Sequence, residues 1–241
     1  MVTILHTNDF HNALNPQKAA HLLSLKRDNP DSMLLDAGDA IWAGNVIVRP
    51  GGEPVLRLMS RAGYDAMALG NREFHFLQSG LRKKIGWAEF PVVCANIRPT
   101  RPRVSVPVVS YITREIGGIR VAVLGLTVPM ITQRMLARKV SSFVFDDPVS
   151  VAARIVPELR ASHDLLIALT HIGLGEDRRL ATEVPGIDLI VGGHTHALIE
   201  TPEFVGRTAI VQAGCWAHLV GRVEIELSGN EVGITSGIMK L

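Results

Sequence analysis

Short apolar runs alternate with amphipathic runs along this chain, and the alternation predicts strands that alternate with helices. The predicted strands are Thr3–Thr7, Met33–Asp36, Ala66–Leu69, Val92–Ala95, Val108–Ile116, Ile119–Leu126, Leu165–Leu169, Leu189–Val191, Ala209–Gln212 and Arg222–Leu227. The predicted helices are Pro16–Lys26, Glu53–Ala62, Phe76–Ile85 and Val149–Ala161. Apolar strands bounded by helices indicate an α/β layered fold.

Two features favour mixed sheets over purely parallel ones. Val108–Ile116 and Ile119–Leu126 flank the turn Gly117-Gly118, which is typical of a hairpin. Arg222–Leu227 alternates apolar and polar residues, as a late antiparallel strand does. Thr100–Pro107 is rich in proline and arginine and predicts an irregular surface loop. With no repeat or linker, we expect residues 1–241 to form a single domain.

Composition narrows the function classes. The chain has 241 residues, 47% of them hydrophobic, which suffices for one large core. Its formal net charge is +2, so we expect no nucleic-acid partner, while a small anionic substrate fits the mild basic balance. These patterns contain no information on the oligomeric state.

The start of the chain and its apolar runs bear on location. Met1 leads directly into a strand pattern without a signal-peptide profile, so we expect a cytoplasmic protein. The most apolar run, Val121–Met130, is too short to cross a bilayer, and we expect no membrane partner. Cys94 and Cys215 lie in apolar surroundings typical of buried thiols rather than of a disulfide.

The stretch Asp188–His196 carries the strongest chemical signal. It reads Asp-Leu-Ile-Val-Gly-Gly-His-Thr-His, a buried strand that runs into a glycine turn with two imidazoles. In an extended turn His194 and His196 can aim at different points, which suits two neighbouring metal ions better than one. The alternative for this stretch alone is a polar loop with two solvated histidines.

Other predicted strands also end in side chains that bind metals. Five strand ends carry such residues: Asp9 with His11, Asp39, Asn71, His171, and His194 with His196. In open α/β sheets, ligands collect outside the carboxyl ends of the strands, so we expect these groups to converge. Oxygen and imidazole ligands suit Mn, Fe, Zn or Mg. The sequence therefore predicts a metal centre.

The blocks around these residues resemble those of a known family. They are Asn8-Asp9-Phe10-His11, Gly38-Asp39, Gly70-Asn71-Arg72-Glu73-Phe74, Thr170-His171-Ile172-Gly173 and Gly192-Gly193-His194-Thr195-His196. In this order they resemble the calcineurin-like metallophosphoesterases and, within them, the catalytic domain of bacterial 5′-nucleotidases. Connecting segments such as Cys94–Ile97 and Val211–Gly214 also look similar, so the resemblance covers nearly the whole chain.

The resemblance implies a fold and a ligand set. The expected fold is a four-layer α/β/β/α sandwich of two mixed sheets, with the metal site at the carboxyl ends of the strands. Carried over by position, the ligands are Asp9, His11 and His196 for one divalent ion, Asn71, His171 and His194 for a second, and Asp39 as the bridge. Manganese is favoured among the four metals. A hydroxide that bridges the ions would attack phosphorus in line with the departing oxygen.

One position departs from the family pattern. The usual block is Gly-Asn-His-Glu, whose histidine is thought to stabilise the transition state and protonate the leaving group, and here that position is Arg72. An arginine can bind phosphate oxygens, but its pKa above about 12 makes it a poor proton donor. Three residues later, where the nucleotidase pattern has Asp, this chain has His75.

Two interpretations of this exchange are open. In the first, Arg72 binds the phosphate while His75 donates the proton, directly or through water. In the second, both side chains point into solvent and catalysis is weak, because lost general acid catalysis costs on the order of 100-fold to 10,000-fold. The predicted catalytic residues are Arg72, His75 and Asp39.

The resemblance and the ligand set predict a phosphohydrolase. We expect a metal-dependent phosphomonoesterase or phosphodiesterase that acts on nucleotides or related small phosphate esters. The alternative is a metal-binding or regulatory module with little turnover, because Arg72 replaces the usual histidine.

Overall fold

The computed structural model describes residues 1–44, 46–229 and 231–241. Its helices are α1 (Pro16–Arg27), α2 (Pro54–Ala62), α3 (Gln78–Ile85), α4 (Pro148–Ser162), α5 (Leu174–Glu183) and the 3-10 helix η1 (Leu136–Lys139). Its strands are β1 (Val2–Thr7), β2 (Ser32–Asp36), β3 (Ala66–Ala68), β4 (Val92–Val93), β5 (Ile97–Pro99), β6 (Tyr111–Ile116), β7 (Ile119–Thr127), β8 (Phe143–Phe145), β9 (Leu165–His171), β10 (Leu189–Val191), β11 (Glu203–Val205), β12 (Thr208–Val211), β13 (Leu219–Ser228) and β14 (Glu231–Lys240).

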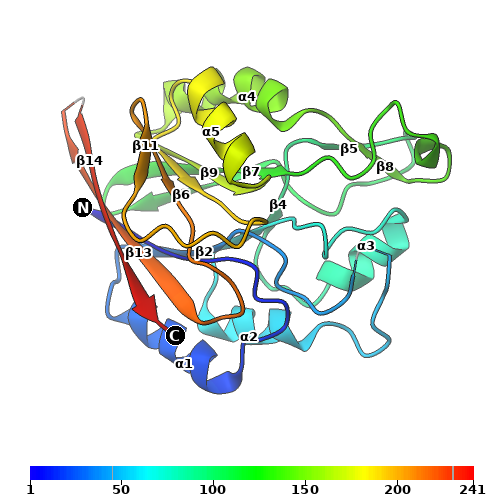
Figure 1. Cartoon of the computed structure of the whole chain (residues 1–241), viewed down its shortest axis with the longest axis horizontal. Helices are drawn as coiled ribbons and strands as arrows, with labels where there is room; N and C mark the ends of the chain where they lie inside the picture. Colours follow the sequence, from blue (N-terminus) through cyan, green and yellow to red (C-terminus); the bar gives the residue numbers. More distant parts are fainter. Residues whose placement is uncertain (45, 230) are drawn as a thin grey trace.

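Most of the described strands belong to two mixed six-stranded sheets. The first has the order β14-β13-β1-β2-β3-β4, in which β1 to β4 are parallel and β13 and β14 antiparallel. The second has the order β11-β12-β10-β9-β7-β6, with four parallel strands between antiparallel edges. Figure 1 shows α1 and α2 outside the first sheet and α4 and α5 outside the second.

Three hydrophobic clusters separate four layers. The first cluster joins α1 and α2 to the first sheet and contains Leu34 and Met59. The second, with Leu35 and Ile167, lies between the two sheets, and the third, with Leu166, joins the second sheet to α4 and α5. Successive strand residues point to opposite faces, so neighbours such as Leu34 and Leu35 serve different clusters. The predicted α/β/β/α sandwich is confirmed.

Local sequence signals set the helix ends. The side chain of Asn15 accepts a hydrogen bond from the Lys18 N–H at 2.9 Å and caps α1. The helix α2 ends at Gly63, whose φ of 80° is a left-handed conformation that glycine adopts without a Cβ clash. None of the helices among the described residues has the length and apolar character needed to span a membrane.

The predicted elements are present, with shifted ends. The helix predicted from Phe76 begins at Gln78, because the extended Leu77 gives its N–H to Nδ1 of His75 at 3.0 Å. The strand predicted from Val108 begins at Tyr111, because Val109 bridges to β4 instead.

Several elements have no counterpart in the predictions. Helix α5 is mostly polar, and its buried residues are Asp177, Leu180 and Ala181, which form too short an apolar pattern to recognise. Strand β14 contains Gly233 and Gly237, which disfavour strands, yet it pairs with β13 along ten residues. The interpretation of Arg222–Leu227 as the last strand is therefore wrong. The pair β5–β8 and strand β11 were also not predicted.

The topology brings the polar strand ends together. The parallel strands β1, β2 and β3 end at one edge of the first sheet, and β9 and β10 end at the same edge of the second. Contacts cross between the sheets there: Nδ1 of His171 lies 2.7 Å from the carbonyl oxygen of Ala37. The loops that follow these strands therefore share one space.

Candidate metal centre

The loops at this edge have an unusual backbone. Five of the predicted ligands are non-glycine residues with positive φ: Asp9 (52°), His11 (48°), Asp39 (57°), His194 (75°) and His196 (55°). Such conformations cost free energy and cluster at functional sites, where the surrounding structure holds them. Here the N–H of Asp9 donates to the Gly38 carbonyl and that of His11 to the Asp39 carbonyl, both at 3.0 Å.

One group of ligand atoms comes from Asp9, His11 and His196. Oδ1 of Asp9 lies 3.4 Å from Nε2 of His196 and 3.8 Å from Nε2 of His11. The two imidazole nitrogens face each other at 2.9 Å. Three donor atoms within 4.8 Å of one another could hold one metal ion.

A second group comes from Asp9, Asp39 and His171. Nε2 of His171 lies 3.5 Å from Oδ1 of Asp39, while its Nδ1 faces the Ala37 carbonyl. That contact orients the ring so that Nε2 faces the group. Asp9 belongs to both groups, whereas the resemblance assigns the bridge to Asp39.

Asn71 and His194 lie beside the second group. Oδ1 of Asn71 is 3.2 Å from Nε2 of His171 and 3.1 Å from Nδ1 of His194. The two imidazole nitrogens are 3.3 Å apart. The structure thus brings together all seven residues predicted as metal ligands.

The protonation of the histidines suits metal binding. Burial and, to a lesser extent, the guanidinium of Arg72 lower the pKa of His11 to about 4. Burial also lowers the pKa of His171 to about 3 and lowers the pKa of His194. These rings are neutral at neutral pH, and a neutral imidazole offers a lone pair to a metal.

The buried carboxylates of the site also favour a bound cation. Burial, with the neighbouring carboxylate of Glu73, raises the pKa of Asp39 to about 8. Oδ1 of Asp9 and Nδ1 of His11 are buried without a hydrogen-bond partner among the described residues. A bound dication would stabilise the ionised carboxylates and occupy free acceptor atoms, so the residues present fit divalent metal ions.

A buried glutamate that we did not single out holds the Asp39 loop in place. The carboxylate of Glu73 is fully buried and accepts N–H groups from Asp39 and Gly70 on Oε2 and from Ala40 and Ile41 on Oε1, at 2.9 to 3.2 Å. Glu73 therefore joins the loops that carry Asp39 and Asn71. The sequence signal was its place in the Gly-Asn-Arg-Glu block.

Asn8 has a similar supporting role. Its Nδ2 donates to Oδ2 of Asp9 at 2.9 Å, and its Oδ1 accepts the N–H of Ala213 at 2.9 Å. Oδ2 of Asp9 also accepts the N–H of His194 at 2.9 Å. These contacts leave Oδ1 of Asp9 directed at the ligand groups.

Arg72 lies against the predicted bridging carboxylate. Its backbone N–H donates to Oδ1 of Asp39 at 2.7 Å, and its Nε is 3.6 Å from Oδ2. Nη1 donates to the carbonyl of Trp42 at 3.1 Å. The side chain is one-third exposed, so its guanidinium borders the metal centre and can still meet a ligand from solvent.

The side chain of His75 is buried rather than pointing into solvent. Its side chain stacks on Phe76, and a Cβ at Gly80 would overlap the ring. Nδ1 accepts the N–H of Leu77. Burial lowers the pKa of His75. The ring is part of neither group of ligand atoms among the described residues.

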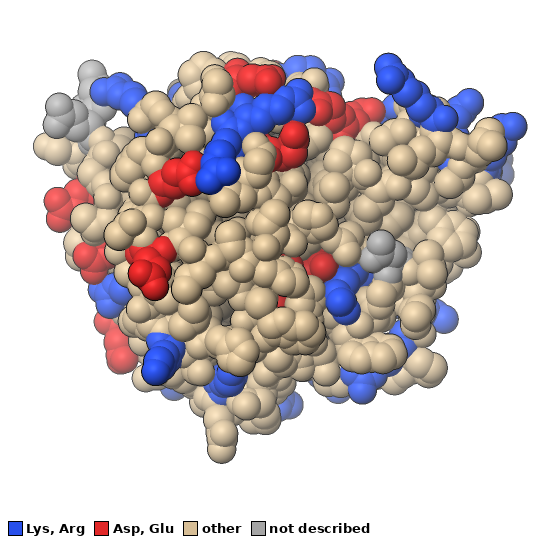
Figure 2. Space-filling model, viewed as in Figure 1, with Lys and Arg blue, Asp and Glu red and all other residues tan. Residues whose placement is uncertain are grey.

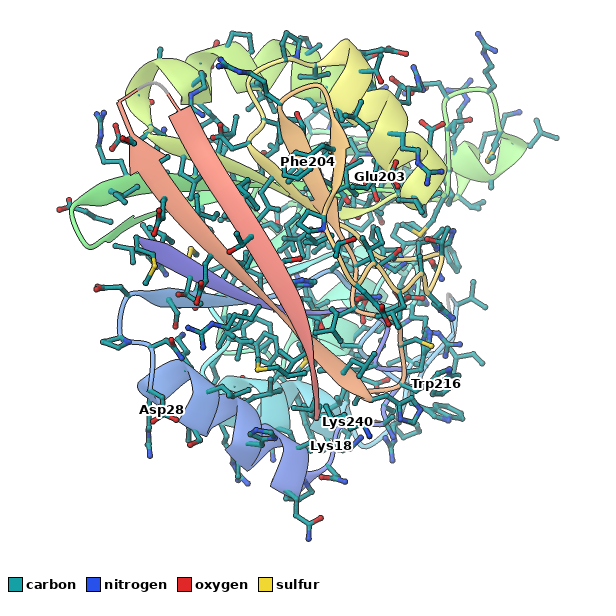
Figure 3. The ribbon with its side chains drawn as sticks, turned by 60° about the vertical axis from the view of Figure 1, so that its left-hand side comes forward. Lys18, Asp28, Glu203, Phe204, Trp216 and Lys240 are labelled. Carbon is teal, nitrogen blue, oxygen red and sulfur yellow. The ribbon has the colours of Figure 1, made fainter. Side chains whose placement is uncertain are left out.

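Trp216 borders the first group and was not predicted from the sequence. Its ring centroid lies 4.8 Å from that of His11, and nearly half of its surface is exposed. The N–H of Trp216 donates to the Asp9 carbonyl, and Lys18 of α1 donates to the carbonyl of Ala217. Figure 3 shows Trp216 on the loop before β13.

Two polar residues that follow strand β4, Asn96 and Arg98, have structural contacts rather than a place in the ligand groups. Asn96 donates to the carbonyls of Thr127 and Asp146 at 2.7 and 3.1 Å, which ties two loops together. Arg98 forms an ion pair with Asp146 at 2.8 Å.

Comparison with known proteins places the chain in a family. The calcineurin-like phosphoesterase model matches residues 2–198. The chain is 31% identical over 263 residues to the trifunctional nucleotide phosphoesterase protein YfkN of Bacillus subtilis, covering 93% of this chain and 18% of that protein. It is 30% identical over 283 residues to a 5′-nucleotidase of Vibrio cholerae, covering 98% of this chain and 50% of that protein.

The fold comparison agrees. A 5′-nucleotidase precursor from Thermus thermophilus superposes with a TM-score of 0.85 and 28% identity, covering 100% of this chain and 54% of that one. The chain thus spans about half the length, or less, of these relatives. It is homologous to 5′-nucleotidase and phosphoesterase enzymes and belongs to the calcineurin-like phosphoesterase family.

Proposed function

We propose that this chain is a metal-dependent phosphohydrolase with a dinuclear centre that acts on nucleotides or related small phosphate esters. The observation that carries the proposal is the convergence of two ligand groups on Asp9, with neutral imidazoles and buried carboxylates around them. The relatives named as nucleotidases and nucleotide phosphoesterases support the substrate class. Manganese is our proposed metal.

The chain's own residues would hold the ions and orient the substrate. Divalent ions at this centre would supply the Lewis acidity that polarises a phosphate ester and activates water. Asp39, fixed by Glu73 and Arg72, keeps its carboxylate beside His171. The guanidinium of Arg72 would bind a phosphate oxygen at the exposed side of the centre, where its planar fork can form charge-assisted hydrogen bonds.

The proton for the leaving group requires a second residue, since Arg72 does not release one. We retain His75 as the proposed donor, in the same loop. Its Nδ1 already accepts from Leu77, so the donor would be Nε2, either directly or through water. Burial lowers the pKa of His75 and so favours the neutral ring. The single N–H of that ring would then be on Nε2.

The decisive experiment is turnover by protein stripped of metal and reloaded with manganese. The substrates are bis(p-nitrophenyl) phosphate, p-nitrophenyl phosphate, AMP and a 2′,3′-cyclic nucleotide, and Asp39→Asn is the blank. We expect metal-dependent hydrolysis that the blank lacks. Turnover of the aryl esters alone would mean that the centre works without an effective proton donor.

The second candidate function is a metal-binding module with little turnover. The observation that favours it is Arg72 at the position of the family's histidine, in contact with Asp39. Manganese binding without hydrolysis of any of the four substrates would support this candidate and overturn the phosphohydrolase.

A further inference from the structure

One end of the molecule has positive charge only. We define the basic arm as residues 97–107 and 129–145, which hold β5, η1 and β8. It has no Asp or Glu, and its cations are Arg98, Arg101, Arg103, Arg134, Arg138 and Lys139. Figure 2 shows Lys and Arg gathered at the upper right end of the molecule, where Figure 1 places β5 and β8.

Most of these cations have no counter-charge. Arg98 forms an ion pair with Asp146, and no other ion pair reaches the arm among the described residues. The remaining five cations are exposed. Nη2 of Arg101 donates to the carbonyl of Lys139 at 3.2 Å, which holds the two segments of the arm side by side. Clustered cations of this kind attract an anionic partner.

Exposed apolar side chains are interleaved with the cations. Leu136 is 80% exposed and Val140 66%, and Met135 is also exposed. Val46, 66% exposed on a neighbouring loop, lines with Val140 an apolar hollow of about 320 Å³ at the base of the arm. Contiguous exposed apolar surface in a soluble protein marks an interaction site.

We propose that the basic arm docks on the surface of an anionic lipid bilayer. Apolar side chains such as Leu136 and Val140 would enter the boundary between headgroups and acyl chains, while the cations contact lipid phosphates. Such peripheral binding needs no membrane-spanning helix. The proposal differs from our expectation that the chain has no membrane partner, which rested on the lack of a long apolar run.

The apolar side chains favour a bilayer over a nucleic acid. Surfaces that bind single-stranded nucleic acids combine cations with exposed aromatic rings on which the bases stack. The aromatic residues of the arm, Phe143 and Phe145, are buried, and its exposed apolar residues are aliphatic. Transfer of aliphatic groups from water into hydrocarbon is favourable, whereas their contact with phosphate and sugar stabilises a complex little.

The arm leaves the molecule at the edge of the metal centre. Strand β7 ends at Thr127, and the next residue, Val128, donates its N–H to the carbonyl of His171 at 3.0 Å before the arm begins. A docked arm would therefore bring the centre close to the bilayer. Substrates would then be phosphate esters present at the membrane surface, a consequence that rests on the proposed function, whereas the docking itself does not.

Flotation of the full chain with lipid vesicles tests the docking. The vesicles contain phosphatidylcholine alone or with phosphatidylglycerol at about 30 mol%. One variant removes three charges (Arg134→Gln, Arg138→Gln, Lys139→Gln), and a second replaces the aliphatic residues (Leu136→Ser, Val140→Ser). The control removes three exposed charges outside the arm (Arg27→Gln, Arg61→Gln, Arg154→Gln).

We expect binding to the anionic vesicles and not to the neutral ones. The charge variant should lose roughly 100-fold in partitioning and the serine variant roughly 10-fold, with the control unchanged. All variants should keep the wild-type melting temperature and hydrolyse p-nitrophenyl phosphate as the wild type does. A failure of docking thus remains distinct from a failure of the proposed function.

Three results would overturn the proposal. The first is no binding to anionic vesicles, and the second is an equal loss in the control, which would indicate attraction by net charge alone. The third is a serine variant that binds vesicles as the wild type does while the arm binds a labelled single-stranded RNA. That pattern would indicate that the basic arm binds a nucleic acid rather than a bilayer.

Discussion

Nε of Arg72 lies 3.6 Å from Oδ2 of Asp39, and the Arg72 N–H donates to Oδ1 of the same carboxylate at 2.7 Å. The residue that borders the predicted bridging ligand is thus a permanent cation. In Arg72→His, a ring that can release a proton takes its place. Because His75 is the proposed donor in the wild type, the change is made in the His75→Ala background. There we predict that Arg72→His raises the ratio of AMP turnover to p-nitrophenyl phosphate turnover by about 100-fold, measured as kcat for both substrates.

The control is Arg72→Lys, which keeps the charge and supplies no proton donor of suitable pKa. It should leave the ratio unchanged. A ratio that rises equally in both variants would show that loss of the guanidinium, rather than gain of a donor, is responsible.

The donor role of His75 predicts a selective loss in His75→Ala. Turnover of AMP should fall by about 100-fold or more, while that of p-nitrophenyl phosphate, whose leaving group needs no proton, should change little. Because the ring packs against Phe76 and Gly80, stability will also fall, so the melting temperature is measured beside the kinetics. Equal losses on both substrates would assign His75 a structural role only.

Glu73→Gln should destabilise the protein. The amide nitrogen of glutamine cannot accept the N–H groups that one carboxylate oxygen now receives. We expect the free energy of unfolding to fall by about 3 kcal/mol in urea titrations, together with weaker manganese binding. Glu183→Gln, at an exposed position paired with Arg179, should change stability by less than about 0.5 kcal/mol. Similar effects of the two substitutions would contradict this account.

The two ligand groups predict metal stoichiometry. Stripped wild-type protein should bind two manganese ions per chain in equilibrium dialysis, and His196→Ala should bind one, because only the first group contains His196. His218→Ala, in an exposed loop position, is the control. Metal removal should lower the melting temperature of the wild type, since bound ions stabilise the folded state by mass action. Full occupancy of two sites in His196→Ala would refute the assignment.

The burial of His6 predicts that the folded protein loses stability as the pH falls. His6 is buried, both ring nitrogens lack a hydrogen-bond partner among the described residues, and burial lowers its pKa to about 4. Between that value and the ordinary 6.5, the unfolded chain binds a proton that the folded chain does not. Stability from this group is therefore complete above pH 6.5 and is lost as the pH falls, by roughly 3 kcal/mol at pH 4.

His6→Leu should remove this loss. Urea unfolding at pH 7.5 and pH 5 should show a smaller drop for the variant than for the wild type, by about 2 kcal/mol. The exposed His21→Gln should behave as the wild type does. The ring also packs where a Cβ on Gly221 would lie, so some change common to both pH values is expected. An unchanged pH dependence would exclude His6 as the source.

The predictions from sequence succeeded for the ligand convergence and the layers, which strand geometry determines. Asp9 and Asp39 follow apolar strands and His171 ends one. Parallel strands end at one edge, so the convergence of these residues follows from topology. The same holds for the layers, because Leu34 and Leu35 must face opposite sides of their sheet.

The predictions missed features that depend on distant parts of the chain. Lys84 sits in the last turn of a helix, where a lysine normally faces solvent, yet it is buried and donates to the carbonyls of Gly44 and Phe74 at 2.7 and 3.0 Å. The left-handed backbone of Asp9 or His194 also has no local sequence signal, because it is held by contacts across the sheets.

The contact between Asp9 and the loops near the other end of the chain has a consequence for biosynthesis. His194 follows Asp9 by 185 residues, and the Asp9 carbonyl is bonded only once Trp216 is in place. A nascent chain that stops before residue 194 therefore lacks the first ligand group. Metal uptake becomes a late event that requires strands of the second sheet, and a chain stalled before residue 171, which lacks a ligand of each group, is expected to retain no manganese.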